Sequence, residues 1–171
     1  MRMKYLEQNE IPELFKIVSQ DTIAPYLLAN PNIITETNLG SYLLLTDPGT
    51  IAQAYTIYLD DTLVGVITIN NISLLKKSAY LGILAIDQTI NDKKVTGLCV
   101  KAAKWAIRYV FETLGLNRIY AHTWSDNEGM DAVYKRVGAT HEGTEREHTW
   151  KQGKFVDMKI WAILRKDWNG D

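Results

Sequence analysis

The order of strand-like and helix-like segments is the feature that most restricts the fold of this chain. Three strand-like runs, residues 54–59, 63–69 and 79–86, follow one another and are rich in β-branched, aromatic and other large apolar residues. After them come two segments with helical spacing of apolar residues, separated by one strand-like run. Two further strand-like runs, 139–150 and 154–164, close the chain. This order predicts a mixed α/β or α+β domain with one central sheet.

Two of the predicted helices end at a glycine. Residues 97–114 carry apolar side chains at helical spacing, and Gly115 follows at the position where a left-handed residue commonly ends a helix. A second stripe, within residues 130–137, has the spacing i, i+3, i+4, i+7 and is followed by Gly138. One apolar helical face also predicts a helix over residues 11–19. We therefore expect helices to flank the sheet.

The connecting segments give no sign of a second domain. Residues 20–50 mix prolines, asparagines and threonines with short apolar runs, so short helices and loops are expected there. Asp60 and Asp61 predict a two-residue hairpin turn between the first two strands. The chain has no linker, repeat or low-complexity segment, and its 171 residues fit a single domain.

Composition excludes several classes of protein. Cys99 is the only cysteine, which excludes an internal disulfide and a multi-cysteine zinc site, and no metal centre is predicted. A formal net charge of -1 argues against a nucleic-acid binder. The N-terminus is unlike a signal peptide, and the longest strongly apolar run, residues 80–86, is far shorter than the roughly 20 residues of a membrane helix. We expect a cytoplasmic protein that binds neither nucleic acid nor a membrane.

The near-zero net charge conceals an uneven distribution. Residues 1–85 hold five cations and eight acids, whereas residues 86–171 hold fourteen cations and twelve acids. The segment between Asp92 and Glu112 has no acid and five cations, which are Lys93, Lys94, Lys101, Lys104 and Arg108. This division suits an anionic ligand at the basic segment and a cationic ligand near the acidic half.

Gly97 begins a predicted helix soon after a predicted strand. The free N–H groups of a first helical turn, the helix dipole and the close approach that glycine permits all favour a bound phosphate. Lys93 and Lys94 precede this glycine and strengthen the interpretation. The other three cations of the segment are better explained as the solvated face of an amphipathic helix.

A set of spaced residues fills the second half of the chain. Tyr134 follows Asn127 by seven residues, and Gly138 follows four residues later. The rest of the set comprises Tyr109, Phe111, Leu114, Gly115, Leu116, Arg118, Ile119, Glu142, Gly143, Arg146, Gly153, Asp157, Ile163, Leu164 and Trp168. Through these residues the sequence resembles the GNAT-type N-acetyltransferases, in the branch that acetylates ribosomal-protein N-termini and similar amines. The family's acetyl-CoA loop falls on residues 94–99, where only Gly97 matches outright, and Met130 and Ala139 also depart from the usual residues.

The resemblance implies a fold, an acyl donor and a set of contacts. The fold is a GNAT-like single sheet, mixed but mostly antiparallel, of about six or seven strands, and the donor is acetyl-CoA. Backbone groups near Leu84 and Ile86 would pair with its pantetheine arm, Asn127 would bind the same arm, and Tyr134 would protonate the departing thiolate. The residues implied for the pyrophosphate loop are Lys93, Lys94, Val95, Thr96, Gly97, Leu98 and Cys99.

The general base is not identified by the resemblance. Many family members place a glutamate where this chain has Tyr80. An amine nucleophile must lose a proton before attack, and histidine has the right ordinary pKa for the task. The candidates, acting directly or through water, are His122, His148, Glu142 and Glu147.

Several alternatives remain open. Cys99 has no histidine or acid near it in the sequence, so a covalent mechanism is not expected. Trp124, Trp150 and Trp161 either line an acceptor pocket or belong to the core. The main hypothesis is direct acetyl transfer to a protein N-terminus or a small-molecule amine by a monomer or homodimer. The alternatives are a catalytically degenerate protein that binds acyl-CoA or a partner, and an amino-sugar or antibiotic acetyltransferase.

Overall fold

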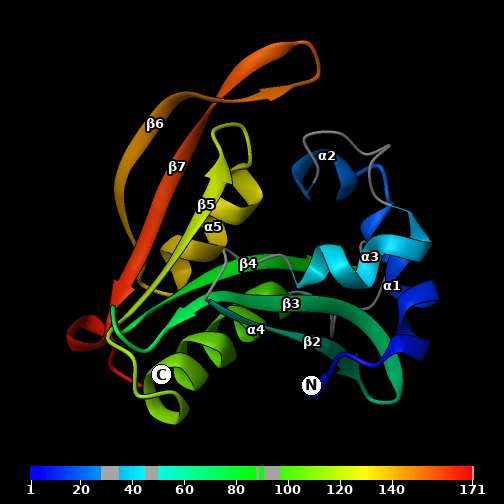
Figure 1. Cartoon of the computed structure of the whole chain (residues 1–171), viewed down its shortest axis with the longest axis horizontal. Coiled ribbons are helices and arrows are strands. Elements are labelled where there is room, and N and C mark those ends of the chain that lie inside the picture. Colours follow the sequence, from blue (N-terminus) through cyan, green and yellow to red (C-terminus); the bar gives the residue numbers. More distant parts are fainter. Residues whose placement is uncertain (28–34, 45–49, 88, 91–96, 171) are drawn as a thin grey trace.

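A seven-stranded sheet forms the centre of the molecule in the computed structural model, which describes residues 1–27, 35–44, 50–87, 89–90 and 97–170 (Figure 1). Its strand order is β1-β2-β3-β4-β5-β7-β6, and every neighbouring pair is antiparallel except β4 and β5. The strands are β1 (Arg2–Tyr5), β2 (Ile51–Leu59), β3 (Thr62–Ser73), β4 (Ser78–Ile86), β5 (Arg118–Trp124), β6 (Thr140–Lys151) and β7 (Lys154–Leu164). The predicted mixed, mostly antiparallel sheet is confirmed.

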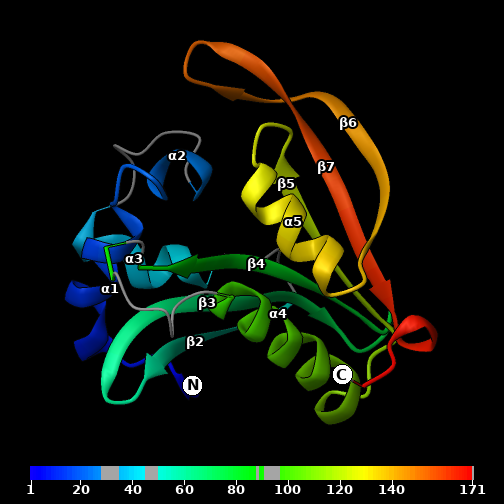
Figure 2. The ribbon, with the colours of Figure 1, turned by 180° about the vertical axis from the view of Figure 1, so that it is seen from behind.

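Helices lie on both faces of this sheet (Figures 1 and 2). The helices are α1 (Ile11–Val18), α2 (Ala24–Leu27), α3 (Glu36–Leu43), α4 (Leu98–Arg108) and α5 (Glu128–Arg136). Shorter helical turns are η1 (Gln8–Glu10), η3 (Tyr109–Thr113) and η4 (Arg165–Asp167). Helices α4 and α5 pack with the sheet in one apolar cluster, and α1 and α3 pack with it in a second. No helix in the described part of the chain is both long and apolar enough to cross a membrane.

Side-chain alternation along the strands separates the two clusters. Val66 and Ile67 are consecutive and fully buried, yet Val66 belongs to the cluster of α1 and α3, and Ile67 to the cluster of α4 and α5. Successive side chains of a strand point to opposite faces, so a strand buried on both faces must be apolar throughout. This explains why the runs predicted as strands are almost continuously apolar.

The predicted helix ends and hairpin turn are present. Gly115 and Gly138 both have positive φ, +63° and +80°, as expected for left-handed residues that end a helix. Asp60 also has positive φ, +53°, in the turn between β2 and β3. The predicted helix over residues 97–114 is α4 followed by η3, a π-helical turn closed by a hydrogen bond from the Leu114 N–H to the Tyr109 carbonyl.

Strand β1 is absent from the sequence-based prediction. It has only four residues and pairs with β2, with Arg2 opposite Tyr58 and Tyr5 opposite Tyr55. A run this short carries almost no alternation, so its strand conformation depends on the partner strand rather than on local preference.

The buried carboxylate of Glu10 joins the N-terminal segment to β2. It accepts hydrogen bonds from the Glu7 N–H (2.7 Å), the Thr56 hydroxyl (3.2 Å) and the Tyr58 hydroxyl, and Lys4 lies 3.5 Å away. Burial alone would raise the pKa of Glu10, but these donors outweigh it and hold the pKa below its usual value. The fold therefore favours the ionised form.

We predict that Glu10→Gln destabilises the protein at neutral pH and much less in acid. A lowered folded-state pKa contributes stability above the unfolded pKa of about 4.3, and that contribution disappears as the pH falls through the folded value. Urea unfolding at pH 7 should show a loss of about 1–2 kcal/mol. Glu13→Gln, in an exposed pair with Lys16, is the control and should change stability by less than about 0.5 kcal/mol. An undiminished difference between wild type and Glu10→Gln at pH 3 would contradict this account.

Candidate active site

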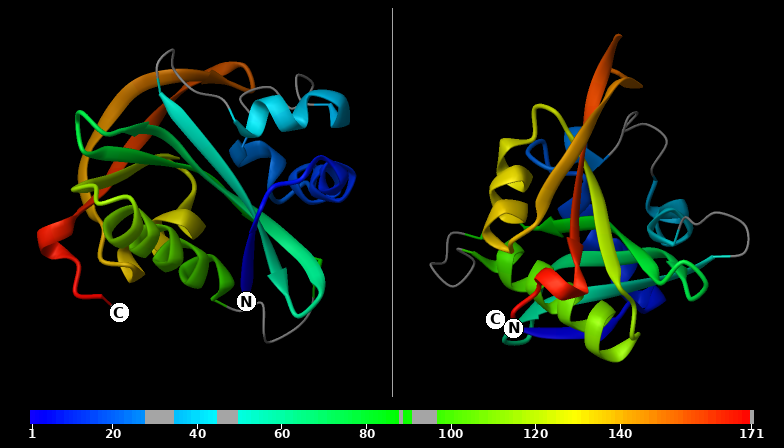
Figure 3. Two further views of the ribbon diagram at one scale, coloured as in Figure 1. Left: turned by 60° about the horizontal axis from the view of Figure 1, so that its bottom comes forward. Right: turned by 90° about the vertical axis from the view of Figure 1, so that its left-hand side faces the viewer.

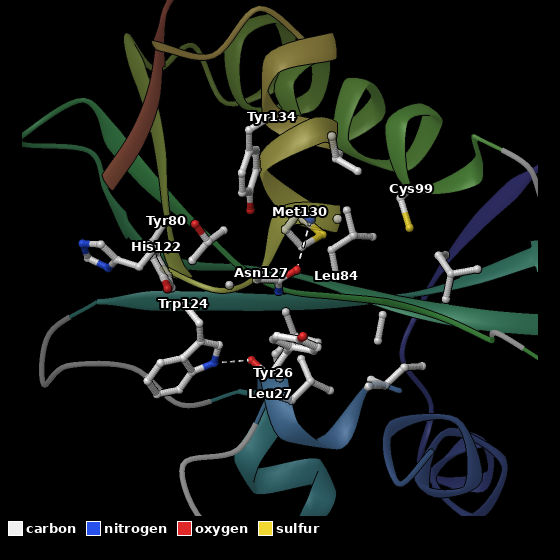
Figure 4. Close-up of a pocket in the computed structure, with 18 of the residues that line it drawn as sticks. Tyr26, Leu27, Tyr80, Leu84, Cys99, His122, Trp124, Asn127, Met130 and Tyr134 are labelled. Carbon is white, nitrogen blue, oxygen red and sulfur yellow. Dashed lines mark hydrogen bonds between the residues drawn. The ribbon is translucent and has the colours of Figure 1, made fainter. Parts of the chain in front are cut away.

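Strands β4 and β5 part soon after they begin to pair. Their parallel register covers only Ser78–Arg118, Ala79–Ile119 and Tyr80–Tyr120. Beyond these pairs the strands diverge, and a pocket of about 740 Å³ occupies the gap between them (Figure 4). The described lining includes no Asp, Glu, Lys or Arg, and His122 is its one histidine.

A β-bulge in β4 shapes the floor of this pocket. Ile69 pairs with Leu81 and Ile67 with Leu84, so β4 has one residue more than β3 in this stretch. The hydroxyl of buried Thr68 accepts the Ile83 N–H at 2.8 Å, which satisfies a donor displaced by the bulge. After the bulge, Leu84 and Ile86 pack with the cluster of α4 and α5 and line the pocket.

Gly82 at the bulge leaves no room for a side chain. A Cβ built on Gly82 would lie 2.5 Å from Thr68 Oγ1 and 2.8 Å from Asn70 Nδ2. The glycine thus lets two polar side chains of β3 approach the backbone of β4. Asn70 lines the pocket, and its buried Oδ1 has no hydrogen-bond partner among the described residues.

The first turn of α4 lies at one end of the pocket. Gly97 precedes the helix with a φ of +77°, and the Lys101 N–H donates to the Gly97 carbonyl at 3.0 Å. The preceding N–H groups, of residues 98–100, have no acceptor within the helix and can bind an anion. The predicted loop residues Lys93, Lys94, Val95 and Thr96 lie outside the described residues.

Cys99 lines the pocket beside this turn and is kept in its thiol form. Burial raises the pKa of Cys99 to about 11, so the nucleophilic thiolate is scarce at neutral pH. Among the cations of α4, Arg108 is exposed, lies 4.0 Å from Glu112 and donates to the Gly170 carbonyl at 3.0 Å. Arg108 therefore belongs to the solvated face of the helix.

Asn127 and Tyr134 project from α5 into the pocket (Figure 4). Asn127 caps the helix, because its Oδ1 accepts the Met130 N–H at 3.1 Å, and its Nδ2 amide is left to donate to a ligand. Tyr134 lies two turns further along, is 4% exposed and stacks on Trp161 with ring centroids 6.1 Å apart. Burial raises the pKa of Tyr134 above its usual value, so the hydroxyl keeps its proton.

A partly buried ion pair anchors α5 to the sheet. Asp131 on α5 pairs with Lys159 of β7, and Lys159 also donates to the Ser125 carbonyl at 2.9 Å. Thr123 donates its hydroxyl hydrogen to Asp131 at 3.1 Å and accepts the Trp161 indole N–H at 3.2 Å. These contacts hold Tyr134 and its stacking partner at the wall of the pocket.

Helix α2 forms the opposite end of the pocket. The Trp124 indole N–H donates to the Tyr26 carbonyl at 2.7 Å, and the Tyr42 hydroxyl donates to the Leu27 carbonyl at 2.8 Å. The buried ammonium of Lys151 lies 4.8 Å from the Tyr26 ring centroid and 4.7 Å from that of Trp124. Sequence reasoning missed these contacts, because they join residues from four separate segments and no local sequence pattern predicts them.

The predicted base candidates occupy different places. His122 lines the pocket at the end away from Cys99, and its ring centroid is 5.6 Å from that of Tyr80 (Figure 4). Burial raises the pKa of Tyr80 to about 12, although a hydrogen bond from the His122 backbone partly opposes this. His148 lies outside the described lining and next to His122, with ring centroids 6.2 Å apart.

The two glutamate candidates do not face the pocket. Glu142 is bound to Arg118 at 2.7 Å, and this contact, with the charge of Arg118, lowers the pKa of Glu142. Glu147 is exposed and outside the described lining. Neither is placed to accept a proton from a ligand in the pocket. Within the described residues, no group of three or more His, Cys, Asp or Glu side chains is arranged to hold a metal ion.

The three tryptophans named from the sequence have three different roles. Trp124 lines the pocket, Trp161 is buried behind Tyr134, and Trp150 is 56% exposed near the turn of the β6–β7 hairpin. The acidic surplus of the first half also lies elsewhere, because none of its described carboxylates lines the pocket. The described lining therefore lacks the negative charges expected to attract a cationic ligand.

We predict that Thr68→Val weakens the bulge that forms the pocket floor. The substitution keeps the shape of the side chain but removes the acceptor of the Ile83 N–H, which should cost about 1–3 kcal/mol in urea unfolding. The affinity for any ligand that binds the backbone of β4 should also fall, because the bulge positions that backbone. Thr62→Val, at the exposed start of β3, is the matched control and should have almost no effect. Equal stability of the two variants would show that the hydroxyl is dispensable.

Comparison with known proteins agrees with this geometry. The profile of the acetyltransferase (GNAT) domain family matches residues 1–140. A Bacillus subtilis (strain 168) protein named as a ribosomal N-acetyltransferase, YdaF, is 29% identical over 112 residues, which are 66% of this chain and 59% of that protein. A second protein of that strain, YjcK, named as an N-acetyltransferase, is 29% identical over 109 residues, 63% of this chain and 58% of that protein. The matched region thus spans less than two thirds of these relatives.

Solved structures share the fold. A RimL ribosomal α-N-protein acetyltransferase in complex with coenzyme A has a TM-score of 0.80 at 20% identity, covering 99% of this chain and 94% of that one. A Vibrio cholerae spermidine N-acetyltransferase in complex with CoA and spermine has a TM-score of 0.80 at 20% identity, covering 97% and 96%. The family match covers most of the chain, and the seven-stranded sheet agrees with it. This chain belongs to the GNAT acetyltransferase family.

Proposed function

We propose that this protein is an acetyl-CoA-dependent N-acetyltransferase that moves the acetyl group directly to a primary amine. The observation that carries the proposal is the pocket through the gap between β4 and β5. It brings the first turn of α4 and the Asn127–Tyr134 face of α5 to one end, and His122 and helix α2 to the other. An acyl donor and an amine can then meet from opposite ends.

The donor end has the groups that acetyl-CoA requires. The N–H groups of residues 98–100 suit the pyrophosphate, as would the loop of Lys93, Lys94, Val95 and Thr96 that precedes them. Strand β5 pairs with β4 only as far as Tyr80, and the β4 edge beyond that point, near Leu84, suits an extended amide-bearing arm. The Asn127 Nδ2 amide can donate to the same arm. Two structural neighbours were solved in complex with CoA, which supports the same assignment.

The acceptor end favours an amine whose remainder is uncharged. One neighbour is a spermidine acetyltransferase, but a polyamine would bring several ammonium groups into a pocket whose described lining has no carboxylate. Burying such charges without partners is costly. The α-amino group of a polypeptide, as in the ribosomal α-N-protein acetyltransferase, or a small monoamine fits better. Asn70 Oδ1 supplies an acceptor for the N–H of that amine.

The chain's own residues account for the proton transfers. His122 accepts a proton from the amine. Burial lowers the pKa of His122, which keeps the imidazole unprotonated near pH 7 and therefore free to accept that proton. Tyr134 donates its hydroxyl proton to the departing thiolate and is reprotonated from solvent. The buried thiol of Cys99 takes no covalent part. The C–N bond forms and the C–S bond breaks in direct transfer through a tetrahedral intermediate.

A second candidate function is binding of acyl-CoA or a partner without turnover. It is favoured by one observation, that Tyr80 stands where many family members place a glutamate base. Calorimetry with acetyl-CoA, combined with a thiol-release assay against N-terminal peptides, polyamines and amino sugars, separates the possibilities. Cofactor binding with amine-dependent CoA release supports catalysis, and binding without release supports the second candidate. Absence of binding at millimolar acetyl-CoA would overturn catalysis and acyl-CoA binding alike, and would leave only partner binding.

We predict that Tyr134→Phe lowers kcat by about 10²-fold, the range of one general acid. Affinity for acetyl-CoA should be nearly unchanged, because the ring still stacks on Trp161. Steady-state kinetics and calorimetry measure the two quantities. If kcat is unaltered while chemistry limits the rate, Tyr134 is not the proton donor.

We predict that Asn70→Leu raises the KM for the amine by about fivefold to tenfold, the effect of one lost hydrogen bond. Asn70→Asp keeps an acceptor oxygen and should leave the KM near or below the wild-type value. Cofactor affinity should be equal in both variants and in wild type. Equal rises of KM in the two variants would mean that the acceptor oxygen is not what binds the amine.

A further inference from the structure

Two histidines, His122 on β5 and His148 on β6, lie near the same carboxylate oxygen. Glu145 Oε2 lies 3.1 Å from His148 Nδ1 and 3.7 Å from His122 Nε2. This oxygen is buried and makes no well-aligned hydrogen bond among the described residues. Of the two residues, His122 lines the pocket, and the side chain of His148 is 44% exposed to solvent. The carboxylate therefore lies between a pocket residue and a solvent-facing one.

An irregular stretch of β6 makes this arrangement possible. Glu145 is opposite Met158, but Thr149 is opposite Val156, so β6 advances four residues while β7 advances two. Glu147 in this stretch has a positive φ of +51°, and its N–H donates to Asp157 Oδ1 at 2.8 Å. A regular strand would place residues 145 and 148 on opposite faces. Because of the bulge, the side chains of His148 and Glu145 lie on the same face of β6.

The surroundings of His122 contain few other charges. Burial lowers the pKa of His122, Glu145 opposes this and His148 adds to it. The other titratable rings packed against His122 are those of Tyr80 on β4 and Tyr120 on β5. On β7, Lys159 pairs with Asp131 at the α5 side of the sheet. Glu145 is therefore the nearest anion to His122 and can set the orientation of its ring.

We propose that His122, Glu145 and His148 form a proton relay, in which Glu145 positions His122 and passes its proton to His148 and solvent. This inference rests on the proposed acetyl transfer and deepens it by adding Glu145 as a positioning residue. His122 presents Nε2–H to the carboxylate, which leaves Nδ1 as the nitrogen that accepts the proton of the amine. Glu145 Oε2 takes the Nε2 proton and transfers it to His148 Nδ1, and the exposed ring releases a proton to water.

The protons balance over one turnover. A protonated amine loses one proton through the relay and becomes a nucleophile, and the C–N bond then forms. A second proton leaves the nitrogen to water as the C–S bond breaks, while Tyr134 protonates the thiolate and regains a proton from water. His122 and His148 then exchange their ring protons with water, which restores Nε2–H on His122 and a free Nδ1 on His148. The products are an N-acetyl amide, free CoA and one proton released to solvent. No oxidant, reductant or further reactant is needed.

The relay is tested by Glu145→Gln and His148→Gln. Each should lower kcat by about tenfold, less than the loss of about 10²-fold for His122→Gln, because only the base itself is indispensable. The acidic limb of kcat/KM should move in opposite directions, to lower pH in Glu145→Gln and to higher pH in His148→Gln. Glu145 favours protonated His122, whereas protonated His148 repels it. A purely structural role would not shift the two profiles oppositely.

Histidine NMR titrations provide a readout that needs no turnover. The pKa of His122 should fall in Glu145→Gln and rise in His148→Gln. His141→Gln, on the same strand but packed on Trp161, is the matched control and should change neither pKa nor pH profile. Unchanged His122 titration in both test variants would overturn the relay. Wild-type protein that releases no CoA with any amine would overturn the proposed function, while the titrations would still decide whether Glu145 couples the two rings.

Discussion

The short parallel contact between β4 and β5 is the constraint on which the site depends. All other neighbouring strands in this sheet are antiparallel, and these two pair over only three residues before they diverge. Beyond Tyr80, β4 no longer pairs with β5 and borders a pocket instead. The right-hand view of Figure 3 shows the β6–β7 hairpin extending away from β2, β3 and β4. A fully paired sheet would have no such opening.

Desolvation explains why the opening suits acid–base chemistry. Burial raises the pKa of Tyr134 and Tyr80 and lowers that of His122, so each of these groups is neutral near pH 7. A neutral imidazole can accept a proton and a neutral phenol can donate one. The described lining contains no Asp, Glu, Lys or Arg, so no formal charge there opposes the neutral state of these groups. The charges that hold the pocket in shape, such as Asp131 with Lys159, lie behind its walls.

Much of the fold follows from the sequence because its determinants are local. Glycine at positions 115 and 138 ends two helices, and the Asp60–Asp61 turn joins two strands, as the sequence predicts. The seven-residue interval between Asn127 and Tyr134 equals two helical turns, so both side chains share one face of α5. Strand β1 escapes prediction for the opposite reason, since four residues have little preference without β2 beside them.

The sequence by itself determined most of the elements and the family, because these depend on spacing within single segments, and it predicted a donor half of the site from the same kind of spacing. Only the tertiary structure decided which histidine reaches the pocket, and it separated Glu142 and Glu147 from it. It also placed Glu145 between His122 and His148 through a bulge whose register no local pattern encodes. Contacts between strands depend on pairing register, and a shift of one residue turns every side chain to the other face. That is the physical reason why the acceptor half could not be derived from the chain alone.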